Sequence, residues 1–420
     1  MVQIKQKKVV VAMSGGVDSS VAALLLQKQG YQVIGMFMRL FAGQQENESA
    51  ARRICQKFKI KFYPINYASQ FKKEVIDYFL NSYNQGITPN PCIKCNQLIK
   101  FGVLLKQANK IGADYLATGH YTRLRREFPI SLPCRPAGNF QFPIKLFKGK
   151  DKDKDQSYFL YTLNQKQLAQ ILFPLGEYTK NQVRKIADKA KLPYLQQESQ
   201  DVCFLTGEHN DFLKQHLDLK SGAIIALPPS LPPAHPSREG GIREKCIKRV
   251  LSPAKHERGR VRVGKKIGEH QGLPLYTIGQ RKGVEIGGIG PFYVVKADYK
   301  TNTLYVTKNR DDKALYKNEL IAKNVNWLSG KEPKLPLQCE AVIRYRHQPV
   351  KCTITLPPTH LLPESFDGVK IRRGEKGERY KVKFNKPQRA ITPGQSVVFY
   401  LPRRVKAGRS DEVLGGGIIT

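Results

Sequence analysis

The sequence is short of acidic side chains. Among its 420 residues, Asp and Glu number 34 against 71 Lys and Arg, which gives a formal net charge of +37. A surplus of this size favours a polyanionic partner, and nucleic acid suits it better than a small nucleotide does. The alternative is a basic surface that only water solvates.

Long apolar runs are lacking too. No stretch reaches the roughly 18 apolar residues that a membrane-spanning helix needs. Lys5–Lys8 followed by Val9–Met13 loosely resembles a signal peptide, but its apolar part is too short and ends in Ser-Gly-Gly-Val-Asp. We therefore expect a cytoplasmic protein whose eight cysteines are reduced.

One stretch near the N-terminus combines a strand, a glycine turn and a helix. Val9–Met13 predicts a buried parallel strand, Ser14–Ser20 (SGGVDSS) a turn, and Val21–Leu26 the opening of an apolar helix. Only glycine lets the backbone turn this tightly while its N–H groups stay close to a phosphate. We expect the three serine hydroxyls of the turn and the positive end of the helix to face one anion.

This turn has no Walker lysine after its glycines, and it carries an acid, Asp18, instead. An acid beside bound phosphates suits a Mg²⁺ ion that bridges a leaving pyrophosphate. The string resembles the signature of the PP-loop ATP pyrophosphatases, which split ATP between its α and β phosphates to adenylate a substrate. An ordinary strand–turn–helix, whose glycines only relieve crowding, is the alternative.

Strand and helix patterns alternate from Val9 to about Lys191, which predicts a parallel sheet with helices on both faces. Further expected strands are Gln32–Met38, Lys61–Ile65 and Tyr115–Thr118, and expected helices are Ser49–Phe58 and Phe71–Tyr83. Ligands bind beyond the carboxyl ends of such strands, where Ser14–Ser20, Met36–Arg39 and Thr118–His120 would emerge together. This convergence predicts a single site.

Two stretches show no regular spacing of apolar residues and are predicted to be loops. They are Leu124–Phe142, rich in Pro and Arg, and Pro228–Lys266, which begins with a proline cluster. From Arg238 to Lys266 the second stretch carries eleven Lys or Arg against three Glu. A long stretch of this kind is either functional or disordered. We expect a mobile basic arm that either contacts RNA or is only solvated.

After Gly268 the pattern changes to short runs of Val, Ile and Tyr between turn residues, which predicts an antiparallel β-barrel. The expected strands are Phe292–Val295, Thr303–Thr307, Ala341–Tyr345, Lys351–Leu356, Tyr380–Phe384 and Ser396–Tyr400. The predicted fold is therefore α/β. A parallel-sheet PP-loop domain (1–217) precedes a small central domain (218–290, with the basic insertion at about 228–266) and a C-terminal β-barrel (291–420).

A C-x-x-C pair lies at Cys92 and Cys95 within Thr88–Asn96 (TPNPCIKCN). We expect Cys95 to begin the apolar helix Leu98–Ala108. The dipole of a helix stabilises a thiolate at its N-terminus, and Lys94 adds positive charge. Half of a zinc or iron–sulfur site is the alternative, but the sequence has no second C-x-x-C and no His pair at zinc spacing.

Cys203 lies between Val202 and Phe204, a pattern that alone is typical of an inert core cysteine. The polar residues Glu198–Asp201 before it indicate an edge position instead. The other cysteines have no such context and are interpreted as structural or incidental: Cys55, Cys134, Cys246, Cys339 and Cys352.

Motifs spread over nearly the whole chain, apart from the two insertions, match one family in combination. They are SGGVDSS (Ser14–Ser20), GMFMRL (Gly35–Leu40), TPNPCIKCN (Thr88–Asn96), IKFG (Ile99–Gly102), ATGHYTR (Ala117–Arg123), KDQSYFL (Lys154–Leu160), SQDVCFL (Ser199–Leu205), YTIGQRKG (Tyr276–Gly283) and IRYRH (Ile343–His347). On these strings the chain closely resembles the tRNA-specific 2-thiouridylases. The resemblance implies an ATP-dependent sulfurtransferase that 2-thiolates the wobble uridine, U34, of tRNA.

The resemblance also implies how ATP and Mg²⁺ are used. The implied ATP-binding residues are Ala12, Met13, Ser14, Gly15, Gly16, Val17, Asp18, Ser19, Ser20, Met38 and Gly119. Asp18 would lie near Mg²⁺, and Met36 or Met38 beside the adenine. The uridine would flip into the pocket, and its O2 would attack the α-phosphate and release pyrophosphate.

Two cysteines match the family's sulfur-handling residues. Cys203 resembles the one that carries a persulfide, and Cys95 the nucleophile that frees its sulfur, which would leave a Cys95–Cys203 disulfide. The implied tRNA contacts are Asn90, Lys100, His120, Lys154, Gln156, Ser157, Arg281, Lys282, Arg344 and Tyr345. A capping or core role is the alternative for His120 and for Lys154–Ser157. Implied partners are the tRNAs for Lys, Glu and Gln and a sulfur donor, either a relay protein or a cysteine desulfurase.

Two departures from the family stand out. Many members have Asp where Cys92 stands, so a carboxylate helper is not implied here, and Ile87 replaces a usual Arg. Cys92, Cys95 and Cys203 together could instead hold an iron–sulfur cluster, as in related cytidine thiolases. An RNA-binding module without activity is a further alternative, against which the intact Asp18 and the two key thiols argue.

Overall fold

The structure, a computed structural model, describes residues 6–126, 143–196, 202–205, 207–228, 264–284, 291–357, 365–366, 369–370, 379–402 and 411–420. The chain divides into two compact units: Met1–Leu217 with Asn318–Thr420, and Asp218–Lys317. Most of the two expected loops, residues 127–142 and 229–263, lies outside the described residues.

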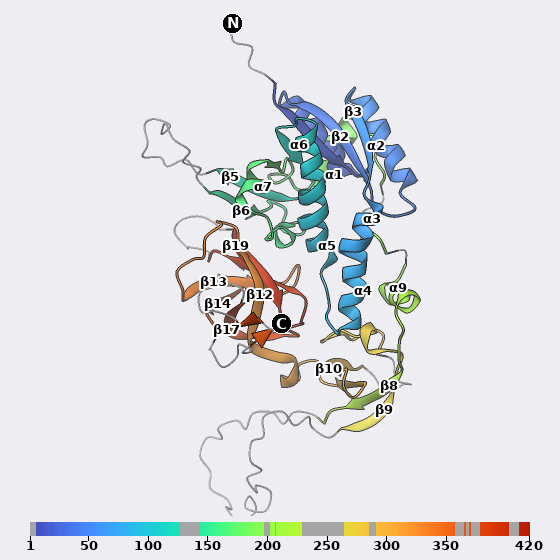
Figure 1. Cartoon of the computed structure of the whole chain (residues 1–420), viewed down its shortest axis with the longest axis vertical. Helices are drawn as coiled ribbons and strands as arrows, with labels where there is room; N and C mark the ends of the chain where they lie inside the picture. The colour runs from blue at the N-terminus through green and yellow to red at the C-terminus, as the bar shows by residue number, and fades with distance from the viewer. Residues whose placement is uncertain are drawn as a thin grey trace, which may run out of the picture. The chain divides into compact units, whose positions relative to one another are not determined.

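The first unit contains a five-stranded parallel sheet in the order β3-β2-β1-β4-β7. Figure 1 labels β2 and β3 of this sheet. Its strands are β1 (Lys8–Met13), β2 (Gln32–Arg39), β3 (Lys61–Asn66), β4 (Tyr115–Ala117) and β7 (Ile171–Leu172). Val9, Val11 and Met13 of β1 belong to one hydrophobic core and Val10 to another. Because successive side chains point to opposite faces, a continuous apolar run is what a sheet covered on both faces requires. The predicted α/β class is confirmed.

Helices α1 (Val17–Lys28), α2 (Gln45–Lys57) and α6 (Leu105–Lys110) pack against strands of this sheet. The other described α-helices of the unit are α3 (Ala68–Phe71), α4 (Asp77–Asn84), α5 (Pro91–Lys94), α7 (Gln165–Ala169), α8 (Lys180–Lys189) and α9 (His209–His216). The π-helical segments η1 (Lys72–Ile76) and η2 (Cys95–Leu104) join α3 to α4 and α5 to α6. The helix expected to start at Cys95 therefore starts at Pro91, because proline suits the first helical turn, where its missing N–H would have no partner.

The C-terminal strands form a closed antiparallel barrel, as predicted. In order these are β12 (Tyr316–Trp327), β17 (Arg379–Arg389), β14 (Val350–Thr355), β13 (Leu337–Val342), β18 (Ser396–Tyr400) and β19 (Glu412–Ile419), and β19 pairs back to β12. β5 (Thr122–Arg126) and β6 (Ile144–Lys148) extend the same sheet from β19. The expected loop at Leu124 is thus wrong for residues 124–126, which pair with β6. β15 (Ser365–Phe366) and β16 (Val369–Lys370) form a separate ribbon.

The second unit contains a four-stranded sheet in the order β10-β11-β8-β9. Its strands are β8 (Gly222–Ala226), β9 (Lys265–His270), β10 (Tyr293–Asp298) and β11 (Thr303–Thr307). The expectation that the strands near 292 and 303 join the C-terminal barrel is wrong. The alternation of apolar and polar residues in these strands would be the same in either sheet. Which sheet they join depends on the pairing of β11 with β8, a strand distant in sequence. Among the helices of the described residues, none is long and apolar enough to cross a membrane.

Candidate active site

The turn after β1 places the N-terminus of α1 at the carboxyl edge of the parallel sheet. Gly15 has φ +80°, and a Cβ there would lie 2.4 Å from the carbonyl oxygen of Asn47. Glycine is therefore needed both for the conformation and for the space. Gly16 caps α1 without a side-chain hydrogen bond, so no side chain of the cap satisfies the first N–H groups of the helix. Such a helix end suits a phosphate.

The serines of the turn have different roles. Ser19 Oγ accepts a hydrogen bond from the Ser14 amide at 3.1 Å and donates to Gly16 O at 3.2 Å. Ser20 is completely buried, and its hydroxyl donates to the same carbonyl at 2.8 Å. The expectation that all three hydroxyls face the ligand is thus wrong for Ser20, which stabilises the turn from inside. Ser14 is exposed.

Asp18 forms an ion pair with Lys180, a residue that the sequence analysis missed. The Lys180 Nζ lies 2.8 Å from both carboxylate oxygens, and the Tyr121 hydroxyl donates to Oδ1 at 2.7 Å. Lys180 is the first residue of α8, and the Lys180 side chain is only 11% exposed. The loop that lacks a Walker lysine in sequence thus receives an ammonium group from 162 residues away. No local pattern could have revealed this.

Three strand ends meet at this edge, as expected from the sequence. β1 pairs in parallel with β2 and β4, with Met13 opposite Phe37 and Val11 opposite Ala117. A Cβ on Gly119 would lie 3.0 Å from atoms of Asp18 and from Ser19 N. The chain after β4 therefore packs directly against the first turn of α1. The strand order reverses between β1 and β4, which is where open α/β sheets bind ligands.

The two predicted thiols lie near enough for Cys203 to influence the pKa of Cys95. Cys95, buried at 7% exposure, lies one turn inside its helix, whereas Cys203 is exposed. Burial raises the pKa of the Cys95 thiol to about 12; the Lys100 charge lowers it, and Cys203 and Cys92 raise it. Neighbouring residues partly desolvate the Cys203 thiol, which raises its pKa against the charge of Lys100, although the side chain stays accessible to solvent. The expected thiolate at a helix N-terminus is therefore wrong for Cys95, because the side chain is desolvated away from the helix end.

Lys100 links the thiols to the end of β4. It is half-buried, and in the described part of the chain its ammonium forms no hydrogen bond or ion pair. Burial, and then the charge of Lys100, hold the pKa of His120 well below its usual value. The neutral His120 ring places Nδ1 2.7 Å from Thr118 Oγ1 and lies 5.8 Å from the Phe101 ring. His120 follows Gly119, so the segment that packs on the phosphate turn ends at a residue that shares the influence of the Lys100 charge with both thiols.

The predicted RNA-contacting residues of Lys154–Ser157 have mainly structural partners. Gln156 Oε1 accepts from the Tyr121 amide at 3.1 Å, which supports the partner of Asp18. Ser157 is fully buried and donates to Asp155 Oδ2 at 2.9 Å. Lys154 is half-buried. The core role, which the sequence left as the alternative, holds for Ser157.

The remaining predicted contacts lie in several places. Asn90 precedes α5 and lines a cavity beside the barrel. Arg344 donates to Thr392 Oγ1 at 3.3 Å, and the Tyr345 ring lies 4.5 Å from that of Phe159. Arg281 and Lys282 are exposed in the second unit.

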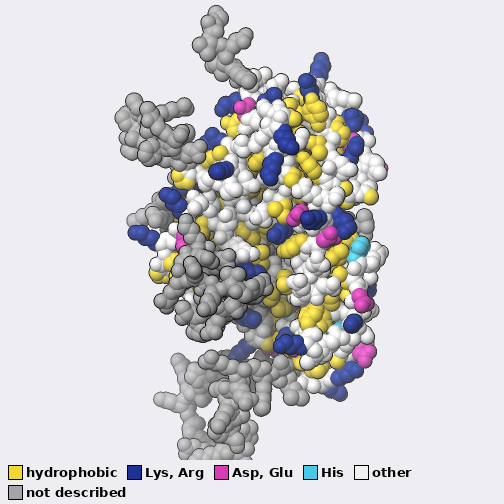
Figure 2. Space-filling view, viewed as in Figure 1, with side chains coloured by type: hydrophobic (Ala, Val, Ile, Leu, Met, Phe, Trp, Pro, Cys, Tyr) yellow, Lys and Arg dark blue, Asp and Glu magenta, His cyan; other side chains and the backbone are white. Residues whose placement is uncertain are grey.

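A basic hollow of about 310 Å³ lies where β5 and β6 meet the barrel. Its lining combines cations with aromatic rings, namely Arg123, Lys148, Lys150, Lys152 and Arg346 with Tyr158, Tyr345 and Tyr400. The Lys148 ammonium lies 4.2 Å from the centre of the Tyr400 ring. Figure 2 shows Lys and Arg spread over the visible face, with few acidic side chains between them. Cations beside aromatic rings suit single-stranded RNA.

The same residues bear on whether a metal ion could be held here. Within the described ranges, no three His, Cys, Asp or Glu side chains form a group that could hold a metal ion. Cys92, Cys95 and Cys203 therefore do not fit an iron–sulfur cluster in this arrangement. Asp18 is a single carboxylate, and both its oxygens contact Lys180.

Comparison with known proteins covers the whole chain. Profiles described as "tRNA methyl transferase HUP domain", "tRNA methyl transferase PRC-barrel domain" and "Aminomethyltransferase beta-barrel domain" match residues 7–207, 244–308, and 317–368 with 363–419. Relatives named tRNA-specific 2-thiouridylase MnmA include those of Protochlamydia amoebophila (38% identity; 99% of this chain, 93% of the relative), Marinomonas sp. (38%; 98% and 91%) and Clostridium perfringens (38%; 99% and 98%). With a phosphate turn, two neighbouring thiols and this similarity along its length, the chain belongs to the tRNA-specific 2-thiouridylase family.

Proposed function

We propose that this protein replaces O2 of the wobble uridine, U34, of tRNA by sulfur in an ATP-dependent reaction. The observation that carries the proposal is that Lys100 acts on both thiols and on His120, which follows the residue that packs on the phosphate turn. Gly119 packs on Asp18, His120 follows it, and Lys100 lies close enough to influence His120, Cys95 and Cys203. A nucleotide at the turn and a pyrimidine beside the thiols would then share one site.

The first step is activation of the uridine. The phosphates of ATP bind at the N-terminus of α1, where Lys180 supplies positive charge near the turn. The uracil O2 attacks the α-phosphate, pyrophosphate leaves, and AMP on O2 becomes the leaving group at C2. Mg²⁺ would neutralise phosphate charge, and Asp18, the one carboxylate of the turn, would hold it only by exchanging its contacts with Lys180 for the ion.

The second step is sulfur transfer. Exposed Cys203 is accessible to a donor protein and would carry the persulfide, whereas buried Cys95 is shielded from solvent. Cys95 attacks the inner sulfur of the persulfide, which forms the Cys95–Cys203 disulfide and releases the outer sulfur as hydrosulfide. Hydrosulfide adds at C2 and AMP departs. A thiol reductant then returns two electrons to the disulfide.

The partners of this reaction follow from the family. We propose the tRNAs for Lys, Glu and Gln as substrates, and a relay protein or a cysteine desulfurase as sulfur donor. The cytoplasm is the proposed compartment.

The test is reconstitution with ATP, Mg²⁺, a persulfide donor and unmodified tRNA, followed by nucleoside mass spectrometry. We expect 2-thiouridine from the wild type and none from Cys95→Ala or Cys203→Ala, with tRNA binding retained in both. Cys352→Ala, a buried cysteine of β14, is the control and should keep activity. A methyl group on the tRNA without thiolation, or normal thiolation by either site variant, would refute the proposal. Stoichiometric iron and sulfide after anaerobic purification would refute the persulfide scheme.

A further inference from the structure

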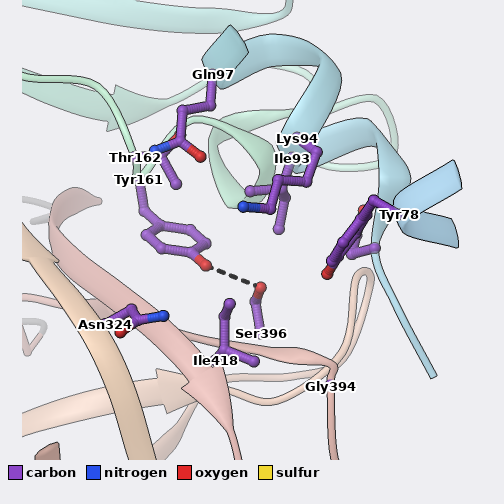
Figure 3. Close-up of a pocket in the computed structure, with 11 residues that line it drawn as sticks. Tyr78, Ile93, Lys94, Gln97, Tyr161, Thr162, Asn324, Gly394, Ser396 and Ile418 are labelled. Atoms are coloured by element: carbon purple, nitrogen blue, oxygen red, sulfur yellow. Dashed lines mark hydrogen bonds between the residues drawn. The ribbon is translucent and has the colours of Figure 1, made fainter. Parts of the chain in front are cut away.

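A cavity of about 270 Å³ lies between the cysteine helix (Pro91–Lys110) and the barrel (Figure 3). Ile93, Lys94 and Gln97 of the helix form one wall, and Tyr78 of α4 stands beside them. The facing wall comes from barrel residues, among them Asn324 and Ser396. The volume is just below the roughly 300–1,000 Å³ of pockets for drug-sized ligands, so the cavity has room for a single base.

This cavity faces away from the reacting thiols. Ile93 and Gln97 are four residues apart and share one face of the helix, whereas Cys95 lies midway between them in sequence. Neither thiol lines the cavity, and two residues after Ile93, where α5 passes into the π-helical η2, Cys95 projects to the other side of the helix. An occupant of the cavity is therefore not the uracil that receives sulfur.

The walls are held in place by hydrogen bonds between the helix layer and the barrel. Tyr161 and Ser396 share a hydroxyl hydrogen bond of 3.0 Å, and Asn326 Nδ2 donates to Leu163 O at 2.9 Å. A Cβ on Gly394, which has φ +89°, would lie 2.1 Å from Ile87 Cγ2. This close packing leaves little freedom, so the cavity is formed before any ligand arrives.

Several polar side chains around the cavity are available to bind a ligand. In the described part of the chain, the side chains of Asn90, Lys94, Gln97 and Asn324 make no hydrogen bond or ion pair. Lys94 only places its ammonium 5.2 Å from the centre of the Tyr78 ring. Three amides and one ammonium offer both donors and acceptors, as the edge of a nucleobase requires, whereas a free anion would call for more cations. Asn324 is exposed, so the mouth is open to a splayed base.

We infer that this cavity binds a second, unmodified base of the tRNA anticodon loop and so selects which tRNA is thiolated. The inference rests on the proposed function, since it takes tRNA as the substrate. One hydrogen-bonded base edge discriminates by about 1–3 kcal/mol, so removal of the bound base should weaken binding about tenfold.

The experiment measures binding of anticodon stem-loops at fixed salt, each lacking the base of one loop nucleotide. For the wild-type protein, removal of the base at one position other than U34 should raise the Kd about tenfold. For Gln97→Leu and Asn324→Gly, removal of the same base should raise the Kd by less than about twofold, since these variants already lack the amide that hydrogen-bonds the base. Asn324 has φ +51°, which glycine tolerates, so this variant keeps the fold even if Gln97→Leu does not.

Gln107→Leu is the matched control, because this half-buried amide lies on the same helix and outside the cavity. It should respond to base removal as wild type does. Equal responses of wild type, Gln97→Leu and Asn324→Gly at every position overturn the inference. The readout is binding alone, so absence of 2-thiouridine in the reconstituted reaction refutes the proposed function without affecting this test.

Discussion

The Asp18–Lys180 pair should respond asymmetrically to loss of one partner. Asp18→Asn keeps the shape but leaves an ammonium that is only 11% exposed without its anion. Breaking a buried pair costs about 3–5 kcal/mol. Because Asp18 is 34% exposed and water screens the pair, we expect about 2–3 kcal/mol. Lys180→Met leaves Asp18, the more exposed partner, whose carboxylate still accepts a hydrogen bond from Tyr121. This variant should therefore lose only about 1 kcal/mol of stability.

The assay is thermal unfolding of the full chain followed by circular dichroism. For a unit as large as Met1–Leu217 with Asn318–Thr420, about 1 kcal/mol lowers the midpoint by roughly 1–2 °C, so Asp18→Asn should lower it by roughly 3–5 °C. Asp18→Asn with Lys180→Met should recover part of this loss, because no unpaired charge remains.

The Lys72–Asp77 pair is the control, since its N–O distance of 2.7 Å is similar but its side chains are 69% and 38% exposed. Lys72→Met and Asp77→Asn should each change stability by less than about 1 kcal/mol. If Lys180→Met were as destabilising as Asp18→Asn, or if both pairs behaved alike, burial would not be the cause.

Three further predictions follow. Lys100→Gln should raise the pKa of Cys203, because it removes the positive charge that lowers this pKa, and should therefore slow alkylation of Cys203 by iodoacetamide at neutral pH. Lys106→Gln, at an exposed position, is the control and should leave the alkylation rate unchanged. An unchanged pH profile of alkylation in Lys100→Gln would contradict the role of Lys100. Gly119→Ala should weaken ATP binding in calorimetry, because its Cβ would press on the first turn of α1 at 3.0 Å, and normal affinity would contradict this contact. Deletion of residues 238–263 should weaken tRNA binding and flatten its salt dependence, while an unchanged slope would mean that the arm is only solvated.

Local chemistry explains what the sequence determined by itself. A continuous apolar run before a glycine turn specified β1 and the helix that follows, because strand burial and left-handed backbone depend on the residues in that stretch. The helix itself, α1, starts at Val17, inside the stretch that the sequence predicted as a turn. The bounds of Thr303–Thr307 and Ser396–Tyr400 agree with β11 and β18, since period-two alternation is also local. The family followed from motifs that stand in the chain as printed.

Tertiary structure decided what depends on distant partners. Lys180 reaches Asp18 across 162 residues, and β11 pairs with β8, which no window of sequence reports. The same applies to burial: Cys95 is desolvated because other elements cover it, so its thiol is harder to ionise than its neighbours in sequence suggest. Residue type and spacing thus predicted which groups take part, whereas packing set their charge states and their partners.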